Sequence, residues 1–218
     1  MSRTRASRSE FYVLSSEFYR RPTLDVARDL IGKVLVHDTP AGLASGVIIE
    51  TEAYIGEADP ACHAAPGPTA RNAPLYGRPG VAYVYLNYGI HYLVNAVTEP
   101  EGSPAAVLIR ALEPVDGEHV MRRRRARGTA RRPGDFARAE LCRGPGNLTR
   151  ALGITIRQNR WDLTRSPLRI EDRGVPPMAV AWTHRVGITV GMEHEWRCHA
   201  VDHPAVSSLK VGARKRRR

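Results

Sequence analysis

Apolar residues near the start of the chain recur at the spacing of an α-helix. Within residues 22–32 they share one face, which is formed by Leu24, Ala27, Leu30 and Ile31. Thr23 is a residue type that caps helix N-termini, and Gly32 is suited to end the last turn. The pattern therefore predicts one short helix directly ahead of the first β-strands.

Beyond this helix, short runs rich in valine, isoleucine and tyrosine predict β-strands separated by turn residues. The expected strands cover residues 33–36, 44–51, 81–86, 90–97, 105–110 and 168–171, with a further strand around 186–190. The first two join as a hairpin, and residues 87–89 form the tight turn of another. Since turns connect these strands and crossover helices do not, the sequence predicts an α+β fold. We expect a single compact domain with a curved, mostly antiparallel β-sheet flanked by helices.

Three stretches depart from these patterns. Residues 56–80 are rich in proline and glycine, and a loop of that length inside a compact domain is usually functional. Residues 114–141 are helical in pattern but interrupted by a Pro-Gly pair. A second glycine-proline turn leads into a short helix over residues 148–152, for which Asn147 is the expected N-cap.

No internal repeat or linker divides the 218 residues, so we expect one domain over residues 18–209. A flexible N-terminal segment, 1–17, would precede it and a basic disordered tail, 210–218, would follow. No apolar run approaches the roughly 20 residues that cross a bilayer, and the N-terminus lacks the apolar region of a secretory signal. Three widely spaced cysteines fit a reducing compartment. We therefore expect no membrane partner and a cytoplasmic, nucleoid-associated location, or a nuclear one in a eukaryote.

The net charge of +11 is concentrated in two places. Residues 119–132 hold seven arginines and residues 210–218 hold six lysines or arginines, which leaves 33 − 13 = 20 basic against 22 acidic residues elsewhere. Basic appendages on a near-neutral body are typical of chains that meet polyphosphate. The alternative is a solubilising loop and tail without a partner.

One segment places carboxylates where chemistry is possible. Glu52 follows an apolar strand, with Glu50 and Tyr54 two positions away on either side and thus on the same face. Two carboxylates at this spacing can line a cleft. The alternative is that one or both are solvated acids at a strand end.

Tyrosines gather in a second segment, where Tyr83, Tyr85, Tyr88 and Tyr92 fall within ten residues. Tyrosines on strands are ordinarily packing residues, and that interpretation suits Tyr83 and Tyr92. Tyr88 lies in the turn, where an exposed ring can enter a DNA base step as a wedge. Tyr54 and Tyr85 can hold a displaced base by stacking.

Two further features leave alternatives open. Arg110 ends a strand, where its guanidinium can lie beside Glu52, contact a phosphate or make no specific contact. The backbone N–H groups around Gly144 and Asn147 can bind an anion or form a plain capping turn. A zinc site built on His194, Glu195 and His203 is improbable, because Cys198 replaces the second histidine of the His-Glu-x-x-His pattern. We expect no metal.

Four segments in this order and spacing resemble the 3-methyladenine DNA glycosylases of the alkyladenine (methylpurine) type. They are residues 50–54, residues 83–88, residues 110–114 and residues 144–145. The similarity runs from about Phe18 to about Arg197. Asn147 departs from the family, where a lysine is usual, and Cys198-His199 replaces a common aromatic pair.

The resemblance implies a role for each matching residue. Glu52 is the general base for the attacking water, which Arg110 and the backbone of Val186 help to hold. Tyr54, His63 and Tyr85 enclose the flipped base, and Asn95 disfavours guanine by crowding its exocyclic amine. Tyr88 intercalates, and DNA-backbone contacts fall to Arg71, Gly144 and Asn147.

The implied activity is the flipping of alkylated or deaminated purines from double-stranded DNA and hydrolysis of the N-glycosidic bond, without a cofactor. The lysines, Lys33, Lys210 and Lys215, lie outside these motifs. We therefore expect a monofunctional enzyme that leaves an abasic site, acting as a monomer. The alternatives are a non-catalytic nucleic-acid-binding protein and a metal hydrolase.

Overall fold

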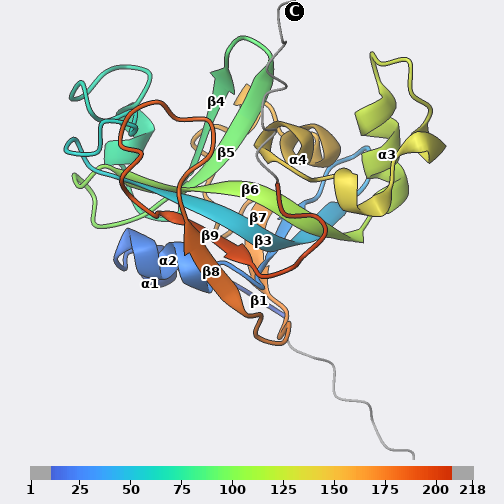
Figure 1. Ribbon diagram of the computed structural model, residues 1–218, viewed down its shortest axis with the longest axis horizontal. Coiled ribbons are helices and arrows are strands. Elements are labelled where there is room, and N and C mark those ends of the chain that lie inside the picture. The colour runs from blue at the N-terminus through green and yellow to red at the C-terminus, as the bar shows by residue number, and fades with distance from the viewer. Residues whose placement is uncertain (1–10, 208–218) are drawn as a thin grey trace, which may run out of the picture.

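A nine-stranded antiparallel sheet organises residues 11–207, the part of the chain that the computed structural model describes (Figure 1). Its strands are β1 (Tyr12–Val13), β2 (Val34–His37), β3 (Ala44–Ile55), β4 (Ala82–Asn87), β5 (His91–Val97), β6 (Ala105–Asp116), β7 (Leu168–Asp172), β8 (Val180–Thr183) and β9 (Arg197–Ala200). Neighbouring strands follow the order β1-β7-β2-β3-β6-β5-β4, and β9 pairs with both β3 and β8. All these pairings are antiparallel, so the predicted fold class is confirmed.

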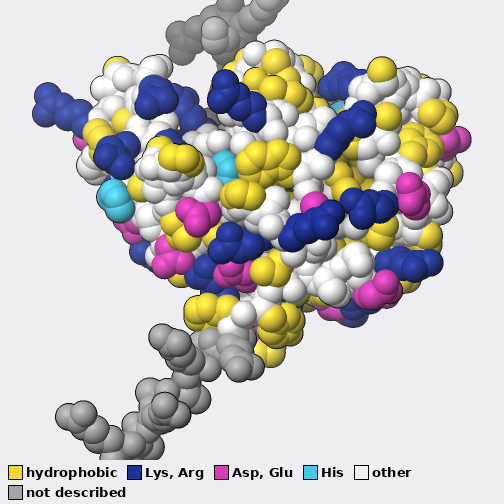
Figure 2. Space-filling model, turned by 180° about the vertical axis from the view of Figure 1, so that it is seen from behind, with side chains coloured by type: hydrophobic (Ala, Val, Ile, Leu, Met, Phe, Trp, Pro, Cys, Tyr) yellow, Lys and Arg dark blue, Asp and Glu magenta, His cyan; other side chains and the backbone are white. Residues whose placement is uncertain are grey.

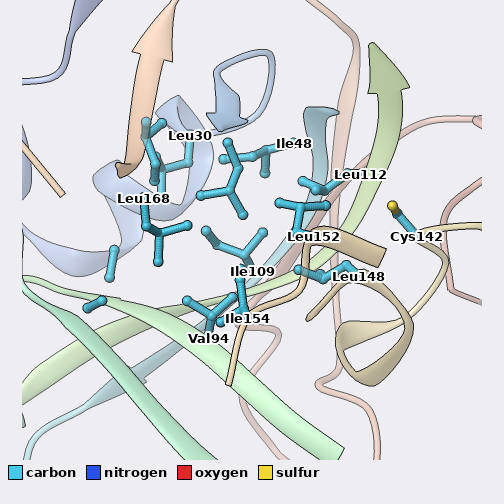
Figure 3. Close-up of a cluster of buried hydrophobic side chains, with 14 of the residues drawn as sticks. Leu30, Ile48, Val94, Ile109, Leu112, Cys142, Leu148, Leu152, Ile154 and Leu168 are labelled. Atoms are coloured by element: carbon cyan, nitrogen blue, oxygen red, sulfur yellow. The ribbon is translucent and has the colours of Figure 1, made fainter. Parts of the chain in front are cut away.

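Short helices flank the sheet. They are α1 (Ser16–Tyr19), α2 (Thr23–Asp29), α3 (Glu118–Ala126) and α4 (Pro145–Leu152), with 3₁₀ turns at Ala73–Tyr76, Pro133–Asp135, Arg138–Glu140 and Ile156–Gln158. Apolar side chains from α2, α4, β3 and β6 meet in the main core. Figure 3 shows this core with Leu30, which directly follows α2, and with Ile48, Ile109, Leu112 and Leu152. No helix within residues 11–207 is long and apolar enough to cross a membrane.

A bulge in β3 decides which side chains face the functional site. The pairing with β6 skips a residue between Ile48 and Glu50, so Ile49 has no partner in the register. A β-bulge moves the residues after it to the other face of the sheet. Ile48 and Ala53 therefore both pack into the main core, while Glu52 lies on the opposite face. Without the bulge, strict alternation from Ile48 would bury Glu52 among apolar side chains.

The expected element boundaries need several corrections. β3 and β6 run to Ile55 and Asp116, beyond the predicted ends at 51 and 110. The helix expected within 114–141 is shorter, because α3 ends at Ala126 and only 3₁₀ turns follow. β1 already pairs with β7 at Tyr12–Val13, inside the segment expected to be flexible. The tail at 210–218 lies outside the described residues.

The strand expected around residues 186–190 is wrong. The segment between β8 and β9 is irregular and carries left-handed backbone at Gly187 and Gly191. The backbone N–H of Val186 donates to a side chain and joins no β-ladder. The valine and isoleucine residues at 186–190 are typical of a strand, and the pattern therefore predicted one there. The regular strand is β8, which ends three residues before Val186.

Both predicted N-caps are also wrong. Thr23 is the first residue of α2, and its backbone N–H donates to Glu99 at 2.7 Å, so a carboxylate from outside the helix satisfies this end. Asn147 is the third residue of α4, where Gly144 occupies the N-cap position. The amide of Asn147 donates to the carbonyl of Arg143 at 2.7 Å. Propensity predicted both helices but placed the start of α4 three residues too late, at 148 and not at Pro145. It also did not show which groups satisfy the first N–H donors of either helix.

Candidate active site

A cavity of about 330 Å³ opens where β3 to β6 meet the loop at 56–80 and the segment after β8. Its walls include six of the residues expected at the base or the water, namely Tyr54, His63, Tyr85, Asn95, Arg110 and Val186. The volume lies within the range of small-molecule sites. The structure thus brings together residues that are up to 132 positions apart in the chain (186 − 54 = 132).

Glu52 lies against this cavity through its hydrogen-bond partners and is 0% exposed. Its Oε2 accepts hydrogen bonds from Tyr54 Oη at 2.9 Å and from Arg110 Nη1 at 3.1 Å. Its Oε1 accepts one from the Val186 N–H at 2.6 Å. A carboxylate offers about four lone-pair directions. Three donors leave one direction for a water molecule.

Glu50 and Glu52 respond to their surroundings in opposite ways. Burial raises the pKa of Glu52, against the opposing effects of Arg110 and the Val186 N–H. Burial also disfavours the charge of Glu50, but Arg110 and Arg197 outweigh it and lower its pKa. Two carboxyls pushed apart in this way take different tasks. Glu50 is a fixed anion, and Glu52 is the group with raised proton affinity.

The partners of Glu50 fix the position of Arg110. Arg110 Nε donates to Glu50 Oε1 at 3.0 Å, and Arg197 Nε donates to the same oxygen at 2.7 Å. Ser207 donates its backbone N–H and its hydroxyl to Glu50, both at 2.7 Å. Of the alternatives for Arg110, the position beside Glu52 is the one found. Glu50 holds this guanidinium in place and is itself held by three donors.

Aromatic rings form one wall of the cavity. His63 and Tyr85 lie with ring centroids 4.4 Å apart, and His63 Nδ1 shares a 2.8 Å hydrogen bond with Tyr83 Oη. Burial, with Arg71 nearby, lowers the pKa of His63 and favours its neutral form. Asn95 is buried beside this wall and donates its Nδ2 to the Tyr83 carbonyl at 3.0 Å. The wall is therefore rigid, and Tyr83 is its support.

The β4–β5 hairpin ends in apolar side chains. Tyr88 is 85% exposed, and Leu86 and Ile90 are exposed on either side of it. Tyr88 has left-handed backbone with φ of 48°, as does Gly89, so the two form the turn expected there. The hairpin tip stands out from the body of the protein in Figure 1. Because its ring is exposed at the tip, Tyr88 contributes little to the stability of the protein core.

The residues expected at the DNA backbone lie around the cavity without contacting Glu52. Arg71 is exposed, and its guanidinium lies 5.7 Å from the centroid of the Tyr85 ring. Gly144 and Asn147 lie at the start of α4, next to Pro145, which lines the cavity. The Asn147 amide is committed to the Arg143 carbonyl, so the free donors at this end of α4 are backbone N–H groups.

Several arginines of the basic segment at 119–132 are internal supports. Arg124 donates to the Leu152 carbonyl at 2.8 Å and to Thr39 at 2.9 Å, which ties the C-terminus of α4 to the β2–β3 turn. Arg125 is buried and donates to the carbonyls of Glu140 and Leu141. Arg123 and Arg127, in contrast, are exposed. The number and spacing of arginines in the sequence did not distinguish the arginines that support the fold from the exposed ones.

On the face seen in Figure 2, lysine and arginine side chains are spread from side to side, with acidic side chains between them. No single basic patch dominates this view. The basic segment at 119–132 includes most of α3 and is a folded part of the domain.

The residues of the alternative zinc site lie apart. His194 stacks on Trp196 with centroids 4.0 Å apart, and His203 Nε2 lies 3.2 Å from Glu113. Within the described residues, no group of three metal-binding side chains comes together.

Some residues at the site carried no sequence signal. Arg197 and Ser207 hold Glu50, and Asp59 pairs with Arg185 at 2.6 Å although 126 positions separate them. Arginines and acids are frequent in this chain, so such pairs stand out only once burial is known. Both side chains of the Arg185–Asp59 pair are 0% exposed.

A buried carboxylate behind an aromatic-lined cavity is suited to hydrolysis of a bond that joins a flat ring system to another group. The chain belongs to the Methylpurine-DNA glycosylase family, whose pattern matches residues 17–204. The predicted family, the class of DNA glycosylase and the repair of alkylated DNA are thereby confirmed.

Relatives named "Putative 3-methyladenine DNA glycosylase" match most of the chain. The protein of that name from Methanocella arvoryzae is 46% identical over 204 residues, which cover 92% of this chain and 98% of the relative. The one from Rubrobacter xylanophilus is 49% identical over 170 residues, or 78% and 84% of the two chains. The one from Salinibacter ruber is 43% identical over 206 residues, or 89% and 96%.

Proposed function

We propose that this enzyme flips an alkylated purine out of duplex DNA into the cavity beside Glu52 and hydrolyses its N-glycosidic bond with a water that Glu52 activates. The observation that carries the proposal is the fully buried Glu52 carboxylate, whose three hydrogen-bond donors, on Tyr54, Arg110 and Val186, all belong to residues that line the aromatic cavity. The names of the relatives point to 3-methyladenine as one such lesion.

The cavity suits a positively charged purine. Alkylation at a ring nitrogen gives the base a positive charge, which the faces of Tyr85 and Tyr54 attract. The neutral form of His63 avoids repulsion of that charge. Departure of the base removes the charge, so the alkylated purine is already a good leaving group.

The chemistry then requires a nucleophile and a place for one proton. Glu52 takes a proton from water while the water oxygen bonds to C1′, and the electron pair of the C1′–N bond leaves with the purine. Arg110 and the Val186 N–H hold Glu52 on the two sides away from the water. The ionised carboxylate also stabilises positive charge on the sugar.

Access to C1′ requires that the nucleotide leave the helix. Base flipping costs a few kcal/mol, and least at a damaged or mispaired base. We assign the wedge to Tyr88, which can fill the vacated space while Leu86 and Ile90 contact the neighbouring groove. Asn95, at the cavity wall, would crowd the exocyclic amine of guanine.

We also propose that the enzyme is monofunctional. Cleavage of the DNA strand by a glycosylase needs an amine nucleophile, and Lys33 is paired with Asp172 at the other end of the sheet. Lys210 and Lys215 lie outside the described residues. The product would be an intact strand with an abasic site. We expect a monomer, which sedimentation of the purified protein would test.

The deciding experiment compares the wild-type protein with Glu52→Gln on duplex DNA that contains methylated purines, in the presence of a chelator. Glu101→Gln, which changes an exposed carboxylate in the β5–β6 loop, is the control. We expect base release to survive chelation and the control substitution and to be lost in Glu52→Gln. DNA binding without base release by the wild type would identify a non-catalytic binder instead. Loss of release on chelation would support a metal hydrolase.

A further inference from the structure

The Arg185–Asp59 ion pair is the most deeply buried one in the described residues, with both side chains 0% exposed. The contact is bidentate: Arg185 Nη1 lies 2.6 Å from Asp59 Oδ2, and Nη2 lies 2.8 Å from Oδ1. Charges buried this deeply are costly to desolvate, and a pair of them is weak evidence of stability. A role at the adjacent cavity would explain why the pair is there.

Arg185 joins separate backbone segments around that cavity. Its Nη1 donates to the carbonyl of Ala53 on β3, and its Nη2 donates to the carbonyl of Gly191, both at 3.1 Å. Its guanidinium lies 4.7 Å from the centroid of the Tyr54 ring and 5.1 Å from that of Trp196 on the approach to β9. Arg185 therefore fixes the Tyr54 ring whose hydroxyl contacts Glu52.

Asp59, in the loop at 56–80, likewise joins backbone segments near the cavity. It accepts hydrogen bonds from the backbone N–H groups of Ile55 at 3.3 Å and of Ala61 at 3.0 Å. The stretch that follows carries Ala61 and His63 to the cavity wall. The pair thus ties this loop to β3 and to the segment after β8.

From this geometry we infer that the Arg185–Asp59 pair is a positioning device for Glu52, which aims the Val186 N–H and the Tyr54 hydroxyl at its two oxygens. Val186 follows Arg185 directly, so an anchored Arg185 side chain fixes the direction of the next backbone N–H. No regular strand holds this segment in place, since residues 184–196 are irregular. The inference rests on the proposed role of Glu52 as general base.

The charged and titratable groups that face Glu52 come from several elements. They are Glu50 and Tyr54 on β3, Tyr85 on β4, Arg110 on β6, and Arg185 beyond β8. The Asp59→Asn substitution removes none of these groups. This makes Asp59→Asn the most informative variant, because two explanations predict opposite results for it.

If the pair acts only through charge, Asp59→Asn removes a negative charge near Glu52. The carboxylate would then ionise more readily, and the acid midpoint of base release would fall. If the pair acts by position, the Val186 N–H loses its alignment and ionised Glu52 loses a donor. The acid midpoint would then rise. We expect the rise.

The experiment measures single-turnover base release against pH with the full chain in excess, together with affinity for a duplex that holds an abasic analogue. We expect Asp59→Asn and Arg185→Lys to slow release by up to about 10²-fold, as small misplacements of catalytic groups do, with DNA affinity unchanged. Arg173→Gln is the control, because it breaks ion pairs with Glu171 and Asp116 away from the cavity. We expect it to lower the melting temperature and leave the acid midpoint unchanged.

Several outcomes would overturn the inference. One is an acid midpoint that falls in Asp59→Asn. Another is a wild-type rate of base release and a wild-type acid midpoint in Arg185→Lys, which keeps the charge but loses the bidentate contact. A third is a shift of the acid midpoint in the Arg173→Gln control that equals the shift in Asp59→Asn. If Arg185→Lys does not fold, the acid midpoint of Asp59→Asn decides between the two explanations. Activity that persists in Glu52→Gln would instead refute the proposed function itself.

Discussion

The backbone N–H of Val186 donates a 2.6 Å hydrogen bond to the Oε1 of Glu52, a residue that lies 134 positions earlier in the chain. This contact is formed by a backbone group, so no substitution of the Val186 side chain removes it directly. It also lies in an irregular segment, where alignment depends on neighbouring anchors. The proton affinity of the proposed general base is thus controlled by the tertiary fold.

We predict an acid limit of base release that lies above the ordinary glutamate pKa of 4.5, because burial raises the pKa of Glu52. Glu52 must be ionised to accept a proton, so activity is lost as the pH falls through this raised pKa. Arg110 favours the ionised form, and Arg110→Gln should move the limit to still higher pH. Single-turnover rates across the acid range test both statements.

A useful control for this pH profile is His203→Gln. It removes a titratable group that contacts Glu113 at 3.2 Å, outside the cavity. The acid limit should be unchanged in this variant. A limit that follows His203, or one at or below the ordinary glutamate value, would contradict the assignment to Glu52.

We predict that replacing Tyr88 affects duplex DNA far more than it affects the fold. Tyr88→Asn removes the ring, and asparagine tolerates the left-handed backbone that Tyr88 adopts. Loss of a stacking ring costs roughly 1–3 kcal/mol, which corresponds to about 5- to 140-fold slower base release. The free energy of unfolding should change by less than about 0.5 kcal/mol, because the side chain is exposed.

A duplex that carries the lesion opposite a mismatched base is a control for the Tyr88→Asn variant. A lesion opposite a mismatched base is already poorly stacked, so flipping it is cheaper. Tyr88→Asn should therefore recover much of its activity on such a duplex. Equal losses on matched and mismatched substrates would argue against a wedge.

The sequence predicted most of the sheet, because alternating apolar residues and turn residues act locally. The hairpin around Tyr88 is an example, since Asn87 to Gly89 combine turn-forming residues between two strand patterns. The bulge at Ile49 was not predictable in this way. It depends on how β3 meets β6, and no residue type marks it.

At the candidate site, too, local patterns identified some residues but not those whose role depends on contacts between distant segments. Glu52 and Arg110 were found through their motifs, and the structure places them 3.1 Å apart. Arg185 and Asp59 were missed, because nothing local distinguishes them from the many other charged residues of this chain. Their role depends on burial and on contacts between distant segments, which composition and spacing do not encode.

We predict that Asn95 limits the release of unmodified guanine. It is buried in the cavity wall, and a shorter side chain would leave room for the exocyclic amine. Asn95→Ser should raise guanine release relative to hypoxanthine by about 10-fold or more, as expected for a steric change worth about 1–3 kcal/mol. Val94→Ala, which shortens a core side chain on the same strand, should lower stability without changing this ratio. An unchanged ratio in Asn95→Ser would remove Asn95 from the list of specificity residues.

We predict that the arginines of the basic segment at 119–132 have two separate roles. Arg124 contacts carbonyls at the C-terminus of α4, and Arg127 is exposed one turn later. Arg124→Gln should destabilise the fold by about 1–3 kcal/mol, because charged hydrogen bonds to the Leu152 carbonyl and to Thr39 are lost. Arg127→Gln should change stability by less than about 0.5 kcal/mol. If Arg127 contacts a phosphate, the same substitution reduces the salt slope of DNA binding by about 1.

Thermal unfolding and DNA affinity at several salt concentrations, measured on both variants, test this division. The two arginines have the same charge, so a purely electrostatic role for the segment requires equal effects on the salt slope and on stability. An Arg124→Gln variant that is as stable as the wild type but binds DNA with a reduced slope would reverse the assignment. We expect the opposite pattern, because a guanidinium that already donates to carbonyls and a hydroxyl inside the fold has fewer donors to offer a phosphate.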